Sequence, residues 1–505
     1  MRILGRVESL FALANQIEAR LGGAQRQVDV LTPSLLVRAF CGELVLRRPQ
    51  RRAGAGDVGT SPEGTSGTLI TVLLLVLLAM PAAAANWPAW RGPEGNGICR
   101  EKKLPLRWAT NENVRWRVPL PDRGNSTPIV WNDRVFITQA VEKENRRTVM
   151  CFHRRGGKLL WQAGPTWTEK DLTHENNPHC SPSPVTDGRR IIAWFGSAGV
   201  HCYDFNGREL WRRDLGRQSH QWGYASSPVL YQDLCLLNFG PGPRSHLIAL
   251  DKRTGQTVWK HDLPLIGPEA QWEDFGGEAK AGSPPGTQTV SEVAGSWSTP
   301  VIVPAGGRDE LVLAYPLRLM AWAPHTGELL WTCDGPNIGV YSSPFFGEGI
   351  LGLAASGFTN TVLAVRPGGR GDVTETHRLW RLLPANSKAC IGSGVIFRGH
   401  LYQITYMGFA QCLDLQTGQT LWEERLTGTG ARNSSWSSPV LAGDRLYVPN
   451  QNADVFVLRA GAKFECLATN SLGGERMNAS LAVSDGDIFL RTDRRLWCIG
   501  EVKMR

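Results

Sequence analysis

Two histidines in a short polar stretch are the first candidates for chemistry in this sequence. The stretch HENNPH begins at His174 and ends at His179, and imidazole groups beside a glutamate can bind zinc. A helical zinc site of this kind needs the two histidines one helical turn apart, with the glutamate between them. Here the histidines are five residues apart and Pro178 interrupts any helix. We therefore interpret both histidines as hydrogen-bonding loop residues and predict no metal site.

Other catalytic patterns are absent from the sequence. It contains no GxSxG turn, no Walker phosphate-binding loop and no CxxC pair. His220 lies close to Trp222 but has no catalytic partner beside it. The carboxylates of residues 309–310 and 423–424 fall near predicted turns or outer strands, so paired acid–base catalysis has no support. We predict no catalytic residue, and a hydrolase or lyase that uses His179 or His220 remains the weakest alternative.

Aromatic and amide residues recur at one position of a repeated pattern. Six stretches place Ser or Thr before Pro at the start of an apolar run, and stretches at 392 and 478 are degenerate copies. Three residues before this proline position the sequence holds Asn125, Ser181, Ala225, Trp297, Tyr341, Ile391, Trp436 and Asn478. Because equivalent positions of a radial repeat surround one axis, we expect these side chains to ring the mouth of a channel.

Long polar connections precede several of these positions. They cover residues 166–180, 216–225, 261–296, 383–390, 428–436 and 472–478. These connections add His179, His220, Trp222, Arg432 and Arg476 to the candidate site. Aromatic rings with polar tips beside amides suit a flat polar or sugar-like ligand, or a peptide of a protein partner. The alternative is that Trp297 and Trp436 fill the channel and pack on neighbouring repeats.

The elements that must position these residues are hairpins that end in tryptophan. In AQCLDLQTGQTLW (410–422), Gly418 can adopt the positive φ of a tight turn and Asp414 can accept the free amides of that turn. Related hairpins occur at 151–161, 202–211, 249–259 and 321–331. The repeat tryptophans are Trp116, Trp161, Trp211, Trp259, Trp331, Trp380 and Trp422, with Phe464 as a degenerate eighth.

A repeat of about 40–50 residues with several strands predicts a β-propeller. The eight proline-type starts and the eight closing positions both predict eight blades of four antiparallel strands. Residues 113–120 look like a fourth strand without its first three, whereas residues 478–500 supply three strands without a fourth. We predict an all-β, eight-bladed propeller over residues 113–505, closed by pairing of this N-terminal strand with the last blade, because that pairing removes two exposed edges.

The first 85 residues lie outside the repeats. Residues 69–80 are apolar and are followed by Ala83 and Ala85, which predicts a signal peptide cleaved before Asn86 and too short to span a bilayer. We expect residues 1–68 to be a disordered extension or a wrongly assigned start, residues 69–85 the apolar core and cleavage region, and residues 86–112 an irregular surface segment. The mature chain is expected to be exported, periplasmic or extracellular, without a transmembrane span.

Charge and cysteine content exclude two further classes. The net charge of +9 is spread along the chain without a basic run, so we predict no nucleic-acid partner. Cys151, Cys202 and Cys412 occupy the repeat position that Ala249 and Ala321 occupy elsewhere. Cysteine at such a position behaves as a small core residue, and we expect buried free thiols instead of a disulfide framework.

The repeats resemble the PQQ-like (pyrroloquinoline-quinone-type) propeller repeat, whose pattern AxDxxTGxxxW is matched best at 249–259 and 412–422. In size the chain is similar to the outer-membrane assembly factor BamB, an eight-bladed scaffold. The opening WPAWRGPEGNGI (87–98) resembles exported PQQ-like proteins of planctomycete-type bacteria. Dehydrogenases of this family use adjacent disulfide-bonded cysteines, a calcium ion held by Glu and Asn, and a catalytic Asp. The sequence has no adjacent cysteines, so the resemblance implies the scaffold without its cofactor site.

Two functions follow from these observations. The first is an exported, non-catalytic and monomeric propeller that binds a protein or saccharide partner at the channel mouth and needs no cofactor. The alternative is a PQQ-dependent quinoprotein oxidoreductase that acts on alcohols or sugars with PQQ and calcium. In that enzyme Trp297 or Trp436 would stack on the cofactor.

Overall fold

The computed structural model of the 505-residue chain describes residues 85–501 except 170, 219, 243, 265–294, 337, 356–359 and 385–388. The predictions for residues 1–68 and for the leader up to residue 84 lie outside the described residues. The chain divides into two units, Met1–Pro81 and Ala82–Arg505, and all described residues belong to the second. No helix among the described residues has the length and apolar character needed to cross a bilayer.

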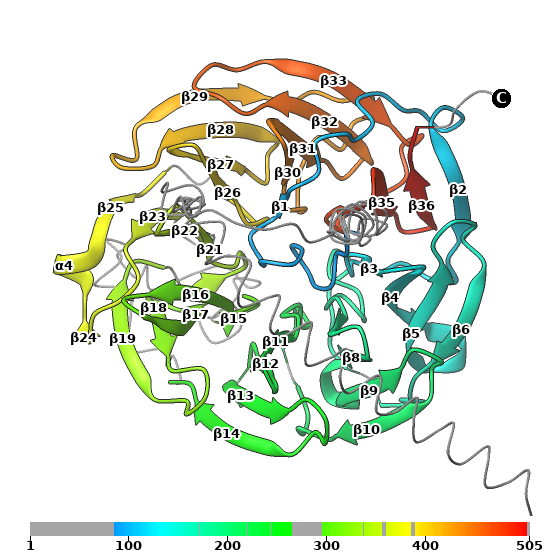
Figure 1. Cartoon of the computed structure of the whole chain (residues 1–505), viewed down its shortest axis with the longest axis horizontal. Coiled ribbons are helices and arrows are strands. Elements are labelled where there is room, and N and C mark those ends of the chain that lie inside the picture. Colours follow the sequence, from blue (N-terminus) through cyan, green and yellow to red (C-terminus); the bar gives the residue numbers. More distant parts are fainter. Residues whose placement is uncertain are drawn as a thin grey trace, which may run out of the picture. The chain divides into compact units, whose positions relative to one another are not determined.

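The second unit is a ring of eight antiparallel sheets around one axis, as Figure 1 shows. Blade 1 contains β3 (Ile129–Trp131), β4 (Arg134–Val141), β5 (Arg146–His153) and β6 (Leu159–Ala163). Blade 2 contains β7 (Val185–Thr186), β8 (Arg190–Trp194), β9 (Val200–Asp204) and β10 (Glu209–Arg213). Blade 3 contains β11 (Val229–Tyr231), β12 (Leu234–Phe239), β13 (His246–Asp251) and β14 (Thr257–Asp262). Blade 4 contains β16 (Val301–Ala305), β17 (Arg308–Tyr315), β18 (Arg318–Trp322) and β19 (Leu329–Asp334).

The second half of the ring repeats this order from the axis outward. Blade 5 contains β21 (Phe345–Gly347), β22 (Ile350–Ala355), β23 (Thr361–Val365) and β25 (Arg378–Leu382). Blade 6 contains β26 (Val395–Phe397), β27 (His400–Ile404), β28 (Phe409–Asp414) and β29 (Thr420–Arg425). Blade 7 contains β30 (Val440–Ala442), β31 (Arg445–Pro449), β32 (Asp454–Arg459) and β33 (Cys466–Ser471). Blade 8 contains β34 (Ala482–Ser484), β35 (Asp487–Arg491), β36 (Arg495–Ile499) and β2 (Val114–Pro119).

A few short elements decorate the blades. β1 (Ile98–Cys99) pairs in parallel with the inner strand β30, and β24 (Gly371–Asp372) pairs in parallel with the outer strand β19. β15 (Gly295–Ser296) and β20 (Gly339–Val340) form a two-stranded parallel ladder. The remaining elements are the 3-10 helices η1 (Glu142–Glu144) and η2 (Gly196–Ala198) and the single-turn helix α4 (Thr374–His377).

The two ends of the propeller sequence meet in blade 8, as the sequence predicts. β2 pairs with β36 in an antiparallel ladder that places Trp116 opposite Cys498. Side chains reinforce the junction with blade 1. Arg154 donates to the Ser484 carbonyl at 2.6 Å, and the buried Arg491 donates to the Thr138 carbonyl at 2.7 Å. The last blade is therefore completed by chain from both ends.

Six repeat tryptophans bond one blade to the next, whereas Trp331 donates to Glu310 of its own blade. Trp161 Nε1 donates to the Phe205 carbonyl at 2.8 Å, and Trp380 Nε1 donates to the Leu415 carbonyl at 2.9 Å. The turn of the next blade passes directly beneath the indole, so a Cβ on Gly418 would lie 2.7 Å from the Trp380 ring. Gly418 also has a φ of +75°. The Thr-Gly turn of the repeat is thus required by both backbone conformation and close packing.

One predicted closing position is wrong. In blade 7 Val457 pairs with Ala468, so Ala468 occupies the position that tryptophan holds in other blades. Phe464 lies in the connection before β33, where its ring packs against Trp422 with centroids 5.3 Å apart. The prediction followed the nearest aromatic residue, whereas the pairing of backbone groups sets the register of a strand.

The ten described cysteines form no disulfide with one another, and nine of them are buried. Cys151 faces Trp161, and Cys412 faces Trp422, in the third strands of their blades. Ala249 faces Trp259 in the same way. For these residues the predicted role of cysteine as a small core side chain is confirmed.

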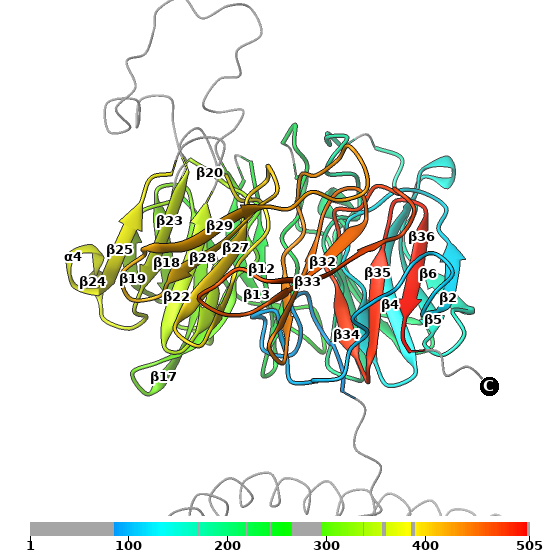
Figure 2. The ribbon, with the colours of Figure 1, turned by 90° about the horizontal axis from the view of Figure 1, so that it is seen from above.

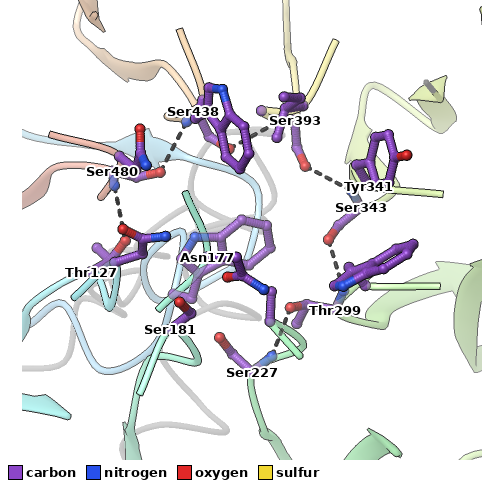
Figure 3. Close-up of a pocket in the computed structure, with 18 of the residues that line it drawn as sticks. Thr127, Asn177, Ser181, Ser227, Thr299, Tyr341, Ser343, Ser393, Ser438 and Ser480 are labelled. Atoms are coloured by element: carbon purple, nitrogen blue, oxygen red, sulfur yellow. Dashed lines mark hydrogen bonds between the residues drawn. The ribbon is translucent and has the colours of Figure 1, made fainter. Parts of the chain in front are cut away.

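A closed ring of hydrogen bonds surrounds the axis, and Figure 3 shows the part that runs from Thr127 through Ser480 to Ser227. In each blade the residue two positions before the first strand accepts, through its side-chain hydroxyl, the backbone N–H of the equivalent residue in the preceding blade. The N···O distances are 2.8–3.1 Å. The ring residues are Thr127, Ser183, Ser227, Thr299, Ser343, Ser393, Ser438 and Ser480. We call this set the hydroxyl ring.

Two adjacent serines test the contribution of the hydroxyl ring. Ser227 Oγ accepts the Ser183 amide at 2.9 Å, whereas the buried Ser226 Oγ has no partner among the described residues. Ser227→Ala should reduce the free energy of unfolding by about 1–3 kcal/mol, because it leaves a buried N–H without an acceptor. Ser226→Ala should be close to neutral. Denaturant unfolding of both variants checks this, and equal losses would contradict the assigned role.

Candidate functional site

The axis of the ring contains a pocket of about 300 Å³. All eight members of the hydroxyl ring line it. All eight residues at the predicted mouth position line it as well, namely Asn125, Ser181, Ala225, Trp297, Tyr341, Ile391, Trp436 and Asn478. Counting from the proline of each first strand therefore located side chains that the fold brings together around one opening.

Aromatic rings form much of the wall. Trp222, Trp297, Tyr341, Tyr406 and Trp436 all line the pocket. Trp297 is only 6% exposed, its Nε1 donates to the Gly223 carbonyl at 3.0 Å, and its ring lies 5.1 Å from that of Tyr341. Most of the Trp297 side chain is therefore buried against neighbouring connections. Trp436 is more exposed and is the freer of the two tryptophans to contact a ligand.

A further tryptophan enters from the N-terminal segment. Residues 85–99 lie on the face opposite the one that carries β20 (Figure 2), and Trp90 of this segment lines the axial pocket. The next residue, Arg91, is buried and donates to the carbonyls of Ser393 and Gly394. Burial lowers the pKa of Arg91 to about 9. Trp87 and Trp108 of the predicted surface segment are also buried, so the segment packs into the propeller core.

The pocket is neutral. None of the described residues that line it is Asp, Glu, Lys, Arg or His. Two buried polar atoms of the wall have no partner among the described residues, the donor Nε1 of Trp222 and the acceptor Oδ1 of Asn125. The amide nitrogen of Asn125 is engaged, since it donates to the Asn176 carbonyl at 2.8 Å. The described wall thus combines aromatic surface with the hydroxyl ring, and these two unpartnered atoms lie buried within it.

The predicted histidines lie behind the wall. His220 accepts the Trp222 amide at Nδ1 and contacts Trp297 edge-on, with ring centroids 4.9 Å apart. Burial lowers the pKa of His220 to about 4. His179 lies outside the lining, and burial together with the charge of Arg147 lowers its pKa to about 4. Neither imidazole lines the pocket, and His220 supports Trp222 and Trp297, which do.

Arg432 and Arg476 lie at the rim and do not line the pocket. Both act on the carboxyl of Asp493, together with Arg123. Burial raises the pKa of this carboxyl, and the charges of these three arginines and of the buried Arg491 oppose that rise. Sequence reasoning included Arg432 and Arg476 but missed Arg123, which lies two residues before Asn125 on the same connection.

Other missed residues come from elements without a repeat signature. Asn177 lines the pocket and donates to the Trp222 carbonyl at 2.7 Å. His174 stacks on Trp222 with ring centroids 4.0 Å apart. Tyr406 belongs to the turn between β27 and β28, which opens on the same face as the fourth-to-first connections. Because strands alternate in direction, the turn between the second and third strands lies on the mouth face, and this rule could have indicated Tyr406. Nothing in the sequence indicates the loop contacts of Asn177.

The pocket does not fit the cofactor of the alternative function. PQQ is a polycarboxylate, and its burial requires cations or many hydrogen-bond donors. The lining residues include no cation. Among the residues that the structure describes, no group of three His, Cys, Asp or Glu side chains could hold a metal ion. No step of a quinoprotein reaction can be derived from this donor set.

The sequence profile of the family described as outer membrane protein assembly factor BamB matches residues 145–269 and 243–501. This chain belongs to that family. A BamB of Alkalilimnicola ehrlichii is 31% identical over 143 residues, which are 28% of this chain and 33% of the relative. The match thus spans about a third of that curated relative.

Solved structures of similar fold include BamB of Moraxella catarrhalis, with a TM-score of 0.53 and 12% identity over 78% of this chain and 98% of that one. The quinohemoprotein alcohol dehydrogenase of Comamonas testosteroni has a TM-score of 0.58 and 12% identity over 85% of this chain and 83% of that one. At this identity both likenesses show the propeller fold alone. Membership in the BamB family therefore rests on the sequence match.

The buried His220 predicts a specific acid sensitivity of this BamB-family propeller. Its pKa is about 4 in the folded state, against about 6.5 when unfolded, so the unfolded state binds more protons as the pH falls through this range. This residue should therefore cost roughly 2 kcal/mol of stability between pH 7 and pH 5. His220→Gln keeps an acceptor for the Trp222 amide and should reduce that loss by a similar amount. Urea unfolding at both pH values checks this, and an unchanged pH dependence would contradict it.

Proposed function

We propose that this protein is an exported, non-catalytic scaffold that binds a protein partner at the mouth of its axial pocket. The observation that carries the proposal is the convergence of all eight mouth positions on a neutral, aromatic pocket. Rigid aromatic side chains around a concave site are typical of peptide and protein recognition. The family is described as an assembly factor, which supports a protein as the partner.

A protein partner suits the pocket better than a saccharide does. Sugars present many hydroxyl groups that must be paired when they are buried. Much of the described wall is aromatic, and no charged side chain lines it. The hydroxyl ring already accepts eight backbone amides. An apolar side chain of a peptide needs few polar partners and fills such a pocket at lower cost.

The proposal includes a monomeric propeller that acts without a cofactor. A binding role needs a stable frame and a face that carries binding loops. One closed ring supplies both. Export would place the mouth in the periplasm or outside the cell. The curved aromatic wall then serves recognition, since the lining residues supply no charged acid or base for catalysis.

Site-specific crosslinking tests the proposed mouth. A photoreactive benzoylphenylalanine replaces Trp436 in the full chain expressed in its own cells, and the control carries it at Leu210, which is 46% exposed on the outer strand β10. We expect a discrete protein adduct from position 436 and none from position 210. Saccharide adducts, no adduct, or equal adducts at both positions would contradict the proposal. The Trp436→Ala variant should no longer retain the crosslinked protein in a pull-down, and its melting temperature should equal that of the native chain.

Titration with PQQ and calcium tests the alternative. Arg123, Arg432 and Arg476 lie outside the pocket lining, and none of the described residues that line it is a cation. Because PQQ buried in the pocket would have no charge partner there for its carboxylates, we expect no saturable change in protein fluorescence. We also expect no reduction of an artificial electron acceptor with ethanol or glucose. Saturable binding with alcohol-dependent dye reduction would overturn the scaffold assignment in favour of the oxidoreductase.

A further inference from the structure

Three arginines stand at the rim of the axial pocket, on consecutive connections. Arg432 lies on the connection into blade 7, Arg476 on that into blade 8, and Arg123 on that into blade 1. Each is followed within four residues by a residue that lines the pocket, respectively Trp436, Asn478 and Asn125. We call Arg123, Arg432 and Arg476 the arginine arc.

The arginine arc makes no close ion pair with the described carboxylates. None of the three arginines lies within 4 Å of a carboxylate oxygen of the described residues, and Arg123 donates to the backbone carbonyl of Glu175 at 3.1 Å. The half-buried Asp493 is the carboxylate on which all three act. The neighbouring Glu475 is paired with Arg495. The arc therefore keeps guanidinium donors free for a ligand.

The described wall residues on the other side of the mouth are aromatic or aliphatic. The connections into blades 4, 5 and 6 supply Trp297, Tyr341 and Ile391 to the wall. The face thus combines a neutral aromatic pocket with a cationic rim on one side. His174 lies between the aromatic wall and the arginine arc. Its ring stacks on Trp222, and the charges of Arg476 and Arg123 act on its imidazole.

This arrangement selects the chemistry of a partner. Guanidinium groups bind carboxylates in bidentate, charge-assisted pairs, and such pairs are stronger beside a water-excluding aromatic surface. The pocket has no charge, so it favours a neutral side chain of aromatic or large aliphatic type. A ligand that satisfies both parts carries an apolar group and carboxylates a few residues away.

We propose that the mouth recognises a protein segment in which one aromatic or large aliphatic side chain is flanked by Asp or Glu. The apolar side chain enters the axial pocket, and the flanking carboxylates bind Arg123, Arg432 and Arg476. This inference rests on the proposed function and specifies the sequence type of the partner. Guanidinium groups also bind phosphate, so a nucleic acid is the competing outcome of the test.

Four synthetic peptides with an N-terminal fluorescein test the inference by fluorescence anisotropy with the full chain. Their five-residue cores are Asp-Glu-Trp-Glu-Asp, Asn-Gln-Trp-Gln-Asn, Asp-Glu-Ala-Glu-Asp and Lys-Lys-Trp-Lys-Lys. We expect the acidic tryptophan peptide to bind about tenfold tighter than its amide analogue or its alanine analogue. The lysine peptide should bind weakest. The affinity of the acidic peptide should fall with added salt, because exposed charge pairs are screened.

Variants test the contribution of the arginine arc separately from that of the axial pocket. The double variant Arg432→Ala and Arg476→Ala should lose about tenfold affinity for the acidic tryptophan peptide and little for the amide analogue. Arg208→Ala is the matched control, because Arg208 is exposed in the turn between β9 and β10 at the other end of the strands. Melting temperatures of all variants confirm that they are folded.

The outcomes distinguish this inference from the proposed function. Equal affinities for the acidic and amide peptides, a double variant that binds like the native chain, or no binding of the acidic peptide would overturn the inference. The proposed function would still stand if crosslinking at position 436 yields a protein adduct. A labelled single-stranded oligonucleotide that binds tighter than the acidic peptide, and loses affinity in the double variant, would also overturn the inference.

Discussion

The closed set of amide-to-hydroxyl hydrogen bonds around the axis is the constraint on which the rest of the structure depends. Each ring residue both donates its amide to one neighbour and accepts an amide from the other, so the register of every first strand is tied to the next blade. A blade that slid along its axis would break two such bonds in a buried site. The residues two positions earlier are consequently held at one height, where they form the wall of the pocket.

Outer contacts then keep the blades upright around this ring. In six of the eight blades the indole donates to the backbone of the next blade, as Trp161 does at Phe205. The chain ends meet in blade 8, where β2 completes the sheet and Arg491 binds blade 1. Because all fourth-to-first connections leave on one face, a rigid frame presents variable loops together. Function can therefore vary by loop sequence while the frame stays constant.

Sequence reasoning predicted the fold and the mouth positions because both follow a period that backbone pairing enforces. It read the proline of each Ser/Thr-Pro pair correctly as a strand start but overlooked the hydroxyl before it, whose partner lies in another blade. The same limit explains Phe464, where the aromatic signal and the strand register disagree. Trp90 and Asn177 were missed because they reach the axis through irregular segments, whose contacts no periodicity records.

Hydrogen exchange tests the central claim most directly. Mass spectrometry with single-residue resolution can follow the backbone amides of the hydroxyl ring, for example those of Ser183, Ser227 and Thr299. If the ring holds the propeller together, these amides should exchange only by global unfolding, as slowly as the most protected core strands. Exchange as rapid as that of the surface loops would show that the ring opens independently. The frame proposed for the binding face would then be contradicted.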